Sequence, residues 1–115
     1  MSIARLVLPL AALFAVPASA ANPAFDAANK AHMESMDSYF TCAFAAMRAS
    51  RAKKLDSKAY LLILNDDCAA EEKQLRDRSV RFAQARGMAP DKARATAEEA
   101  LVAARRDLVR TYSGQ

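Results

Sequence analysis

The pattern of apolar and polar positions predicts a long amphipathic helix that begins near residue 23. At 100° per residue, its largely apolar positions fall on one arc, as they do on a helix with one buried face. These positions are Phe25, Ala28, His32, Met36, Tyr39, Ala43, Ala46 and Met47. Met33, Phe40 and Phe44 widen the arc. We therefore expect this helix to pack against two neighbours.

Two further segments carry apolar stripes with helical periodicity. In the second segment a stripe recurs every seven residues at Leu61, Cys68, Leu75 and Phe82, with Leu64 and Ser79 between them. In the third, the aligned positions are Ala97, Leu101, Ala104, Leu108 and Tyr112, with Val102 and Val109 on the flank. These stripes predict two more amphipathic helices.

Helix start and stop signals bound these segments. Asn22 is a suitable N-cap before Pro23, Gly87 fits a C′ position, and Pro90 begins the last helix. We expect helices over about 23–54, 57–86 and 90–112. The predicted fold is all-α, an antiparallel three-helix bundle in a single domain over residues 21–115.

The joint between the first two helices is not marked by a helix breaker, since no proline or glycine lies between Pro23 and Gly87. One long helix over 23–86 is the alternative to a hairpin. Asp56 can cap a new helix, and basic residues before it complement a helix C-terminus. The polar trio Asn65–Asp67 lies inside the heptad stripe, which continues through it without a phase shift. We therefore place the turn at Leu55–Ser57.

Cys42 and Cys68 are equally distant from residue 55. A hairpin that turns there brings the two cysteines to the same height on neighbouring helices, so we predict an intramolecular disulfide that pins the hairpin. Two unpaired buried thiols, or a disulfide between two chains, are the alternatives.

The N-terminal residues have the features of a secretory signal peptide. Arg5 precedes an apolar run over Leu6–Val16, Pro17 ends the run, and Ala18-Ser19-Ala20 is a small-residue cleavage signal. We predict that residues 1–20 are removed after Ala20 and that the mature chain is periplasmic and has no transmembrane span. An uncleaved N-terminal anchor is the alternative.

Composition argues against several classes of function. Two glycines are too few for a β-barrel or a phosphate-binding loop, and one histidine cannot serve both a catalytic triad and a histidine-rich metal site. Export and the lack of aromatic residues among the basic ones argue against nucleic-acid binding. We expect no enzymatic activity, no nucleic-acid partner and no resident cofactor.

Two clusters invite a metal-binding interpretation. His32, Met33 and Met36 are soft ligands that suit copper, although a methionine-rich apolar face explains the same residues and is favoured. The carboxylates Asp66, Asp67, Glu71 and Glu72 diverge on a helix, and an ion-paired, solvated face is the expected interpretation. A periplasmic copper-binding protein is thus the alternative function.

Basic residues gather at the predicted hairpin turn. We call this group the basic tip, and it consists of Arg48, Arg51, Lys53, Lys54 and Lys58. Asp56 is the acidic residue among them. The tip suits an anionic envelope surface or an acidic protein, while solvated charge that maintains solubility is the simpler explanation. We expect a small binding protein with a role in envelope stress that is a monomer or weak oligomer.

Overall fold

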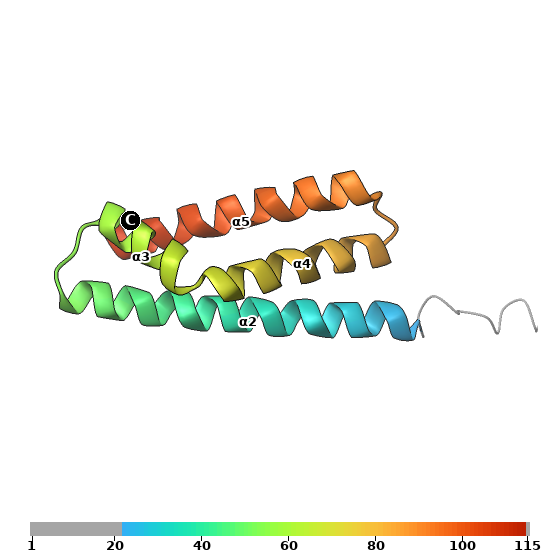
Figure 1. Ribbon diagram of the computed structural model, residues 1–115, viewed down its shortest axis with the longest axis horizontal. Coiled ribbons are helices and arrows are strands. Elements are labelled where there is room, and N and C mark those ends of the chain that lie inside the picture. Colours follow the sequence, from blue (N-terminus) through green and yellow to red (C-terminus); the bar gives the residue numbers. More distant parts are fainter. Residues whose placement is uncertain (1–21, 115) are drawn as a thin grey trace, which may run out of the picture.

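The computed structural model describes residues 22–114, and this part of the chain is all-helical, as predicted (Figure 1). Its helices are α2 (Pro23–Ala52), α3 (Ser57–Asp67), α4 (Ala69–Ala85) and α5 (Pro90–Ser113). The predicted signal peptide, residues 1–20, lies outside the described residues. Within the described range, no helix combines the length and apolar character that crossing a membrane requires.

The helices run back and forth along the length of the molecule. The chain runs along α2, returns through α3 and α4, and reverses again into α5 (Figure 1). α4 packs against both α2 and α5, and α3 contacts the same two helices near the turn that follows α2. α2 and α5 pack mainly against α3 and α4 rather than against each other.

The turn between α2 and α3 is a Schellman motif. The N–H of Leu55 donates to the Ser50 carbonyl, and the N–H of Lys54 donates to the Arg51 carbonyl, both at 3.0 Å. Lys54 adopts the left-handed conformation at φ 56°. The Asp56 side chain then accepts a hydrogen bond from the Ala59 N–H at 2.8 Å and caps α3. The chain thus turns over residues 53–56.

The same motif closes α4. The N–H of Gly87 donates to the Gln84 carbonyl at 2.9 Å, and the N–H of Met88 donates to the Ala83 carbonyl at 3.0 Å. Gly87 has φ 95°, a conformation that glycine adopts without a Cβ penalty. Pro90 begins α5, where its missing N–H breaks no helical hydrogen bond.

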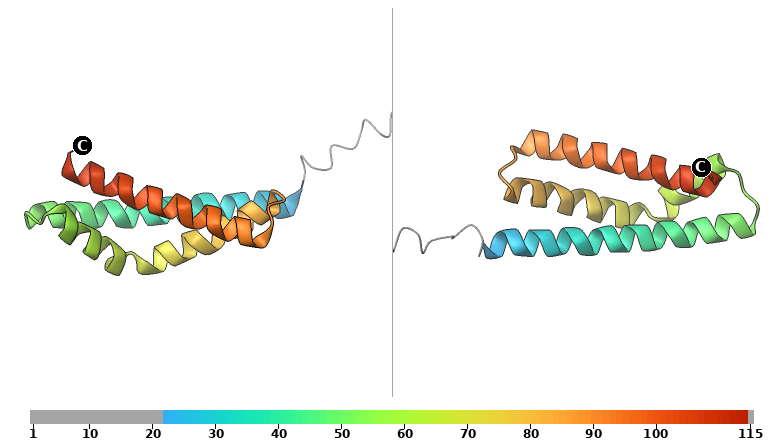
Figure 2. Two further views of the ribbon diagram at one scale, coloured as in Figure 1. Left: turned by 90° about the horizontal axis from the view of Figure 1, so that it is seen from above. Right: turned by 180° about the vertical axis from the view of Figure 1, so that it is seen from behind.

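The second predicted helix, over 57–86, is interrupted at Cys68. This residue has φ −107° and ψ 20°, outside helical geometry, and the turned view in Figure 2 shows α3 and α4 meeting at an angle. Asn65, Asp66 and Asp67 precede the break, and asparagine and aspartate have low helix propensity because their side chains compete for backbone hydrogen bonds.

The core side of α3 includes Tyr60, which the predicted stripe did not contain. Tyr60, Leu64 and Cys68 are at most 1% exposed, whereas Leu61, which the heptad stripe placed in the core, is half-buried. The buried positions of α3 therefore follow a spacing of four residues, and the seven-residue spacing resumes from Cys68 to Leu75 in α4. Leu61 still packs against the edge of the core, so the predicted stripe continues through the break.

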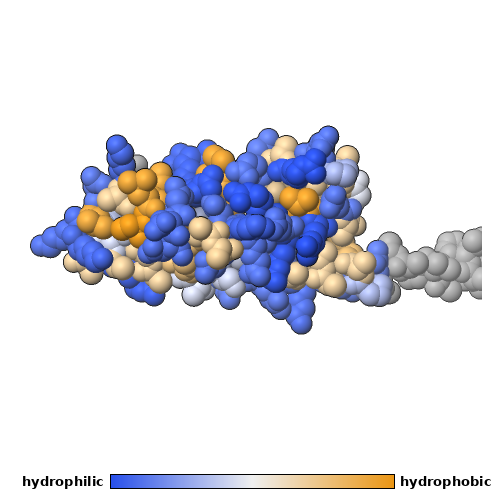
Figure 3. Space-filling view, viewed as in Figure 1, coloured by the Kyte–Doolittle hydropathy of each residue, from blue (hydrophilic) through white to orange (hydrophobic). Residues whose placement is uncertain are grey.

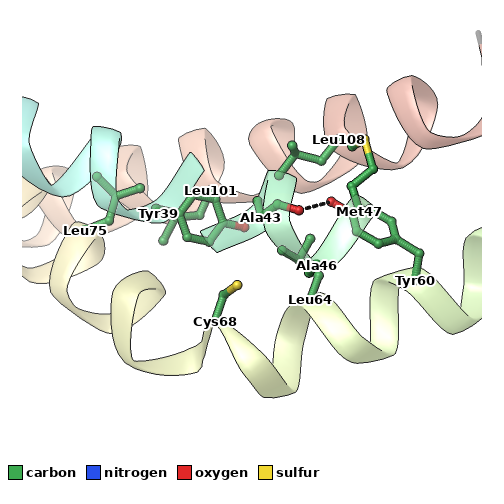
Figure 4. Close-up of a cluster of buried hydrophobic side chains, with 10 residues drawn as sticks. All are labelled: Tyr39, Ala43, Ala46, Met47, Tyr60, Leu64, Cys68, Leu75, Leu101 and Leu108. Carbon is green, nitrogen blue, oxygen red and sulfur yellow. Dashed lines mark hydrogen bonds between the residues drawn. The ribbon is translucent and has the colours of Figure 1, made fainter. Parts of the chain in front are cut away.

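The core is formed by aromatic and aliphatic side chains from all four helices (Figure 4). Tyr39 and Met47 of α2 meet Leu64 of α3, Leu75 of α4 and Leu101 of α5. The apolar arc of α2 is narrower than predicted, because two of its expected members are exposed. These are Met33 and Phe44.

The predicted cysteine pair lies at disulfide distance. The sulfurs of Cys42 and Cys68 are 2.00 Å apart and their Cα atoms are 5.9 Å apart. Cys42 is in the middle of α2, and Cys68 lies at the break between α3 and α4. The crosslink therefore ties α2 to the bend in the returning segment.

Candidate functional site

The basic tip lies at the end of the molecule where α2 turns into α3 (Figure 1). Its members are exposed, and Arg51 also has a contact within the fold. The Arg51 guanidinium donates to the Thr111 carbonyl at 3.0 Å and lies 5.5 Å from the centre of the Tyr112 ring. Arg51 thus joins α2 to the end of α5, which leaves Arg48, Lys53, Lys54 and Lys58 to face solvent.

The positive charge of these four side chains is not balanced locally. Among the residues that the structure describes, none of them forms an ion pair. The carboxylate of Asp56, the acidic residue in this segment, accepts the capping hydrogen bond at the start of α3. Residues 48–58 carry five basic side chains and one acidic one, a net charge as large as the +4 of the whole chain.

Exposed apolar surface lies beside this charge. Leu62 of α3 is 63% exposed, and Leu55, Leu61 and Ile63 are half-buried. In Figure 3, hydrophobic atoms gather over α3 at this end of the molecule, among hydrophilic side chains. This surface was not predicted, although the sequence contains a signal for it: four consecutive apolar residues, 61–64, are more than one helix face can bury.

Side-chain contacts fix the backbone beneath the tip. The Tyr112 hydroxyl donates to the Leu55 carbonyl, and the hydroxyls of Ser57 and Ser113 are hydrogen-bonded to each other. The Tyr60 hydroxyl donates to the Ala43 carbonyl at 3.1 Å. The basic tip is therefore presented by a turn that is anchored to both α2 and α5.

In the predicted copper cluster, Met33 lies apart from His32 and Met36. His32 and Met36 line one apolar pocket of about 160 Å³ between α2, α4 and α5, whereas Met33 is 57% exposed and does not line it. His32 Nδ1 lies 3.1 Å from the Ser79 hydroxyl, and the imidazole stacks on Phe82 with a centroid distance of 5.1 Å. Burial lowers the pKa of His32. These contacts favour the apolar-face interpretation over a three-ligand site.

The carboxylate cluster of the sequence is also divided. Glu72 pairs with Arg105 of α5 and lies 3.7 Å from Arg76, whereas Asp66 and Asp67 are exposed. Arg76 also donates to Glu98 of α5 at 2.8 Å, and this hydrogen bond holds the pKa of Glu98 below its ordinary value. These contacts form an ion-pair network that joins α4 to α5. Within residues 22–114, no group of three or more His, Cys, Asp or Glu side chains is placed to hold a metal ion.

No family model, curated protein or solved structure matches the chain. The basic tip combines unbalanced positive charge with exposed leucine, a combination that suits an anionic amphiphilic surface.

Proposed function

We propose that this protein is an exported, non-catalytic binding protein that attaches through its basic tip to acidic lipid headgroups of the cell envelope. The observation that carries the proposal is the exposed Leu62 one helical turn from Lys58 on α3, the helix that follows the turn with Lys53 and Lys54. Cationic side chains are attracted to acidic lipids, and an adjoining leucine can enter the boundary between headgroups and acyl chains.

The expected strength of this attachment is modest. Each lysine or arginine near an anionic membrane contributes about 1 kcal/mol, so the four solvent-facing basic residues contribute about 4 kcal/mol at moderate ionic strength. Partial burial of Leu62 adds up to about 2 kcal/mol. The sum favours reversible attachment that weakens as salt rises, because exposed charges are screened.

The proposed location rests on the cysteine pair and on the N-terminal sequence. Disulfides persist in oxidising compartments, which agrees with export directed by residues 1–20, cleavage after Ala20 and a periplasmic mature chain. In this proposal, α3 and α4 together form the middle leg of an antiparallel three-helix bundle. The protein acts as a monomer or weak oligomer.

Co-sedimentation with lipid vesicles tests the proposal. Vesicles that contain phosphatidylglycerol are compared with pure phosphatidylcholine vesicles, using the wild type and the double variant Lys53→Glu/Lys54→Glu. The control is Lys30→Glu/Lys92→Glu, which makes the same change in net charge at the opposite end of the molecule (Figure 1).

We expect the wild type and the control to sediment with the acidic vesicles, and the tip variant to bind them at least about tenfold more weakly. Equal weakening in both variants would show that net charge, rather than the tip, controls binding. Absence of wild-type binding to acidic vesicles would overturn the proposal.

A further inference from the structure

A groove of about 550 Å³ lies between α3 and α5, next to the basic tip. Leu61, Val102 and Val109 supply its apolar surface, and Asn65 lies with Leu61 on the α3 side. Val102 is 50% exposed, so the apolar surface of the groove is open to solvent. Three arginines complete the lining, namely Arg105, Arg106 and Arg110.

The groove has an excess of positive charge. None of the described residues that line it is acidic. Arg105 is occupied by Glu72 of α4, whereas Arg106 and Arg110 share the single carboxylate of Asp107, each at 3.9 Å. These last pairs are exposed and contribute little. Arg106 and Arg110 thus remain available to an anionic group beside an apolar surface.

Two other hollows lack this combination. The pocket beside His32 is apolar but measures about 160 Å³, below the roughly 300–1,000 Å³ of typical small-molecule sites. A groove between α4 and α5 also measures about 550 Å³, but its arginines face Asp77 and Glu98, so its charge is largely balanced. Apolar lining and unbalanced positive charge thus coincide in the α3–α5 groove.

We propose that the α3–α5 groove binds one acyl chain of an anionic phospholipid, with the chain against Leu61, Val102 and Val109. The phosphate faces Arg106 and Arg110, because guanidinium groups hold phosphate with paired, charge-assisted hydrogen bonds. Val102 and Val109 are two helical turns apart, which gives the chain about 10 Å of apolar surface. This inference rests on the proposed function, since attachment of the tip brings the groove to the lipid.

The groove lies where a lipid acyl chain could reach it from a membrane at the basic tip. Leu61 lies one helical turn beyond Lys58 of the basic tip, and the exposed Leu62 follows it directly. A membrane that contacts the tip therefore also reaches the end of the groove at Leu61. The tip would hold several headgroups at the surface, and the groove would hold a single lipid more specifically.

Titration with a single-chain lipid below its micelle concentration tests the groove separately from the membrane surface. Lysophosphatidylglycerol is added to the full mature chain and binding is followed by amide NMR shifts. Lysophosphatidylcholine and glycerol 3-phosphate are the comparison probes, one without net charge and one without a chain. The variants are Val102→Gln/Val109→Gln and Arg106→Gln/Arg110→Gln. Met33→Gln is the control, because Met33 is an exposed apolar residue of α2 that lines neither the groove nor the basic tip.

We expect saturable binding of lysophosphatidylglycerol with shifts along α3 and α5, about tenfold weaker binding by either groove variant, and unchanged binding by Met33→Gln. Glycerol 3-phosphate that binds as tightly as the lipid would overturn the acyl-chain assignment. Equal binding by both groove variants and the wild type would overturn the site.

The two proposals fail in different ways. If the wild type sediments with acidic vesicles but shows no saturable binding of lysophosphatidylglycerol, the groove proposal is wrong and the tip proposal stands. If the wild type does not sediment with acidic vesicles, the tip proposal fails, and the titration with lysophosphatidylglycerol decides the groove proposal by itself. A tip variant that no longer sediments but still binds the monomeric lipid would support both.

Discussion

The rings of Tyr60 and Tyr112 stack with their centroids 4.6 Å apart and an angle of 10° between their planes. Tyr60 belongs to α3 and Tyr112 to α5, and the Tyr60 hydroxyl reaches across to the Ala43 carbonyl of α2. A single aromatic pair thus joins three helices directly beneath the basic tip. Tyr60 is fully buried, so we expect this end of the fold to depend strongly on its side chain.

Truncation of Tyr60 should therefore destabilise the protein strongly. We expect Tyr60→Ala to lower the free energy of unfolding by about 3–5 kcal/mol, because it removes the stacking and leaves a cavity. Tyr60→Phe keeps the ring and removes the hydrogen bond, so its cost should be about 1 kcal/mol. Urea unfolding followed by circular dichroism measures both. Equal effects of the two substitutions would contradict a dominant role for ring packing.

The turn at Lys54 has the geometry that glycine occupies at Gly87. Both residues are the C′ position of a Schellman motif with φ above zero, but Lys54 carries a Cβ in that conformation. We expect Lys54→Gly to raise the free energy of unfolding by up to about 1 kcal/mol. The reciprocal change, Gly87→Ala, should lower it by about 1–2 kcal/mol.

The space around Gly87 makes this comparison informative. No atom lies within 4 Å of a Cβ placed on Gly87, so the expected cost of Gly87→Ala arises from the backbone conformation rather than from a clash. Melting temperatures of the two variants and the wild type provide the measurement. If Lys54→Gly instead lowers the melting temperature, the lysine side chain stabilises the fold by more than its left-handed backbone conformation costs.

Local signals in the sequence predict the ends of the helices better than their packing. Asn22 and Asp56 accept capping hydrogen bonds, and Gly87 occupies the left-handed position, as their residue types suggest. The break at Cys68 could not be predicted from the heptad stripe, because hydrophobic spacing continues through a bend when the helices on both sides bury the same face. The low helix propensity of residues 65–67 was the available signal.

The candidate site could also be predicted from the sequence only in part. The charge of the basic tip is visible in the sequence, but the separate role of Arg51 depends on the end of α5, which is sixty residues away in the chain. The α3–α5 groove also needs both helices to be placed before its lining residues come together. Residues such as Val102 and Arg106 carry no local pattern that marks them as neighbours of Leu61.

The crosslink between Cys42 and Cys68 should contribute a large part of the stability. In the chain-entropy model, a loop of this length corresponds to about 3.5 kcal/mol. We expect the variant Cys42→Ala/Cys68→Ala to lose about 2–4 kcal/mol in urea unfolding. Non-reducing mass spectrometry of the exported protein checks the pairing itself. Two free thiols, or a dimer that reduction separates, would show that the intramolecular bond is not formed.

His32 should make the stability depend on pH in the mildly acidic range. Burial lowers the pKa of His32 in the folded protein below its ordinary value of 6.5. At a pH between this lowered pKa and 6.5, the unfolded chain therefore binds a proton that the folded protein does not. Protonation of His32 therefore leaves the free energy of unfolding unchanged well above pH 6.5, and lowers it as the pH falls towards the pKa of the folded state. His32 is the one histidine in the chain, and its neutral ring stacks on Phe82 and contacts Ser79.

We expect urea unfolding to show a loss of stability for the wild type between about pH 7.5 and about pH 5.5, and a smaller loss for His32→Gln. The same loss in both proteins would place the titrating group elsewhere.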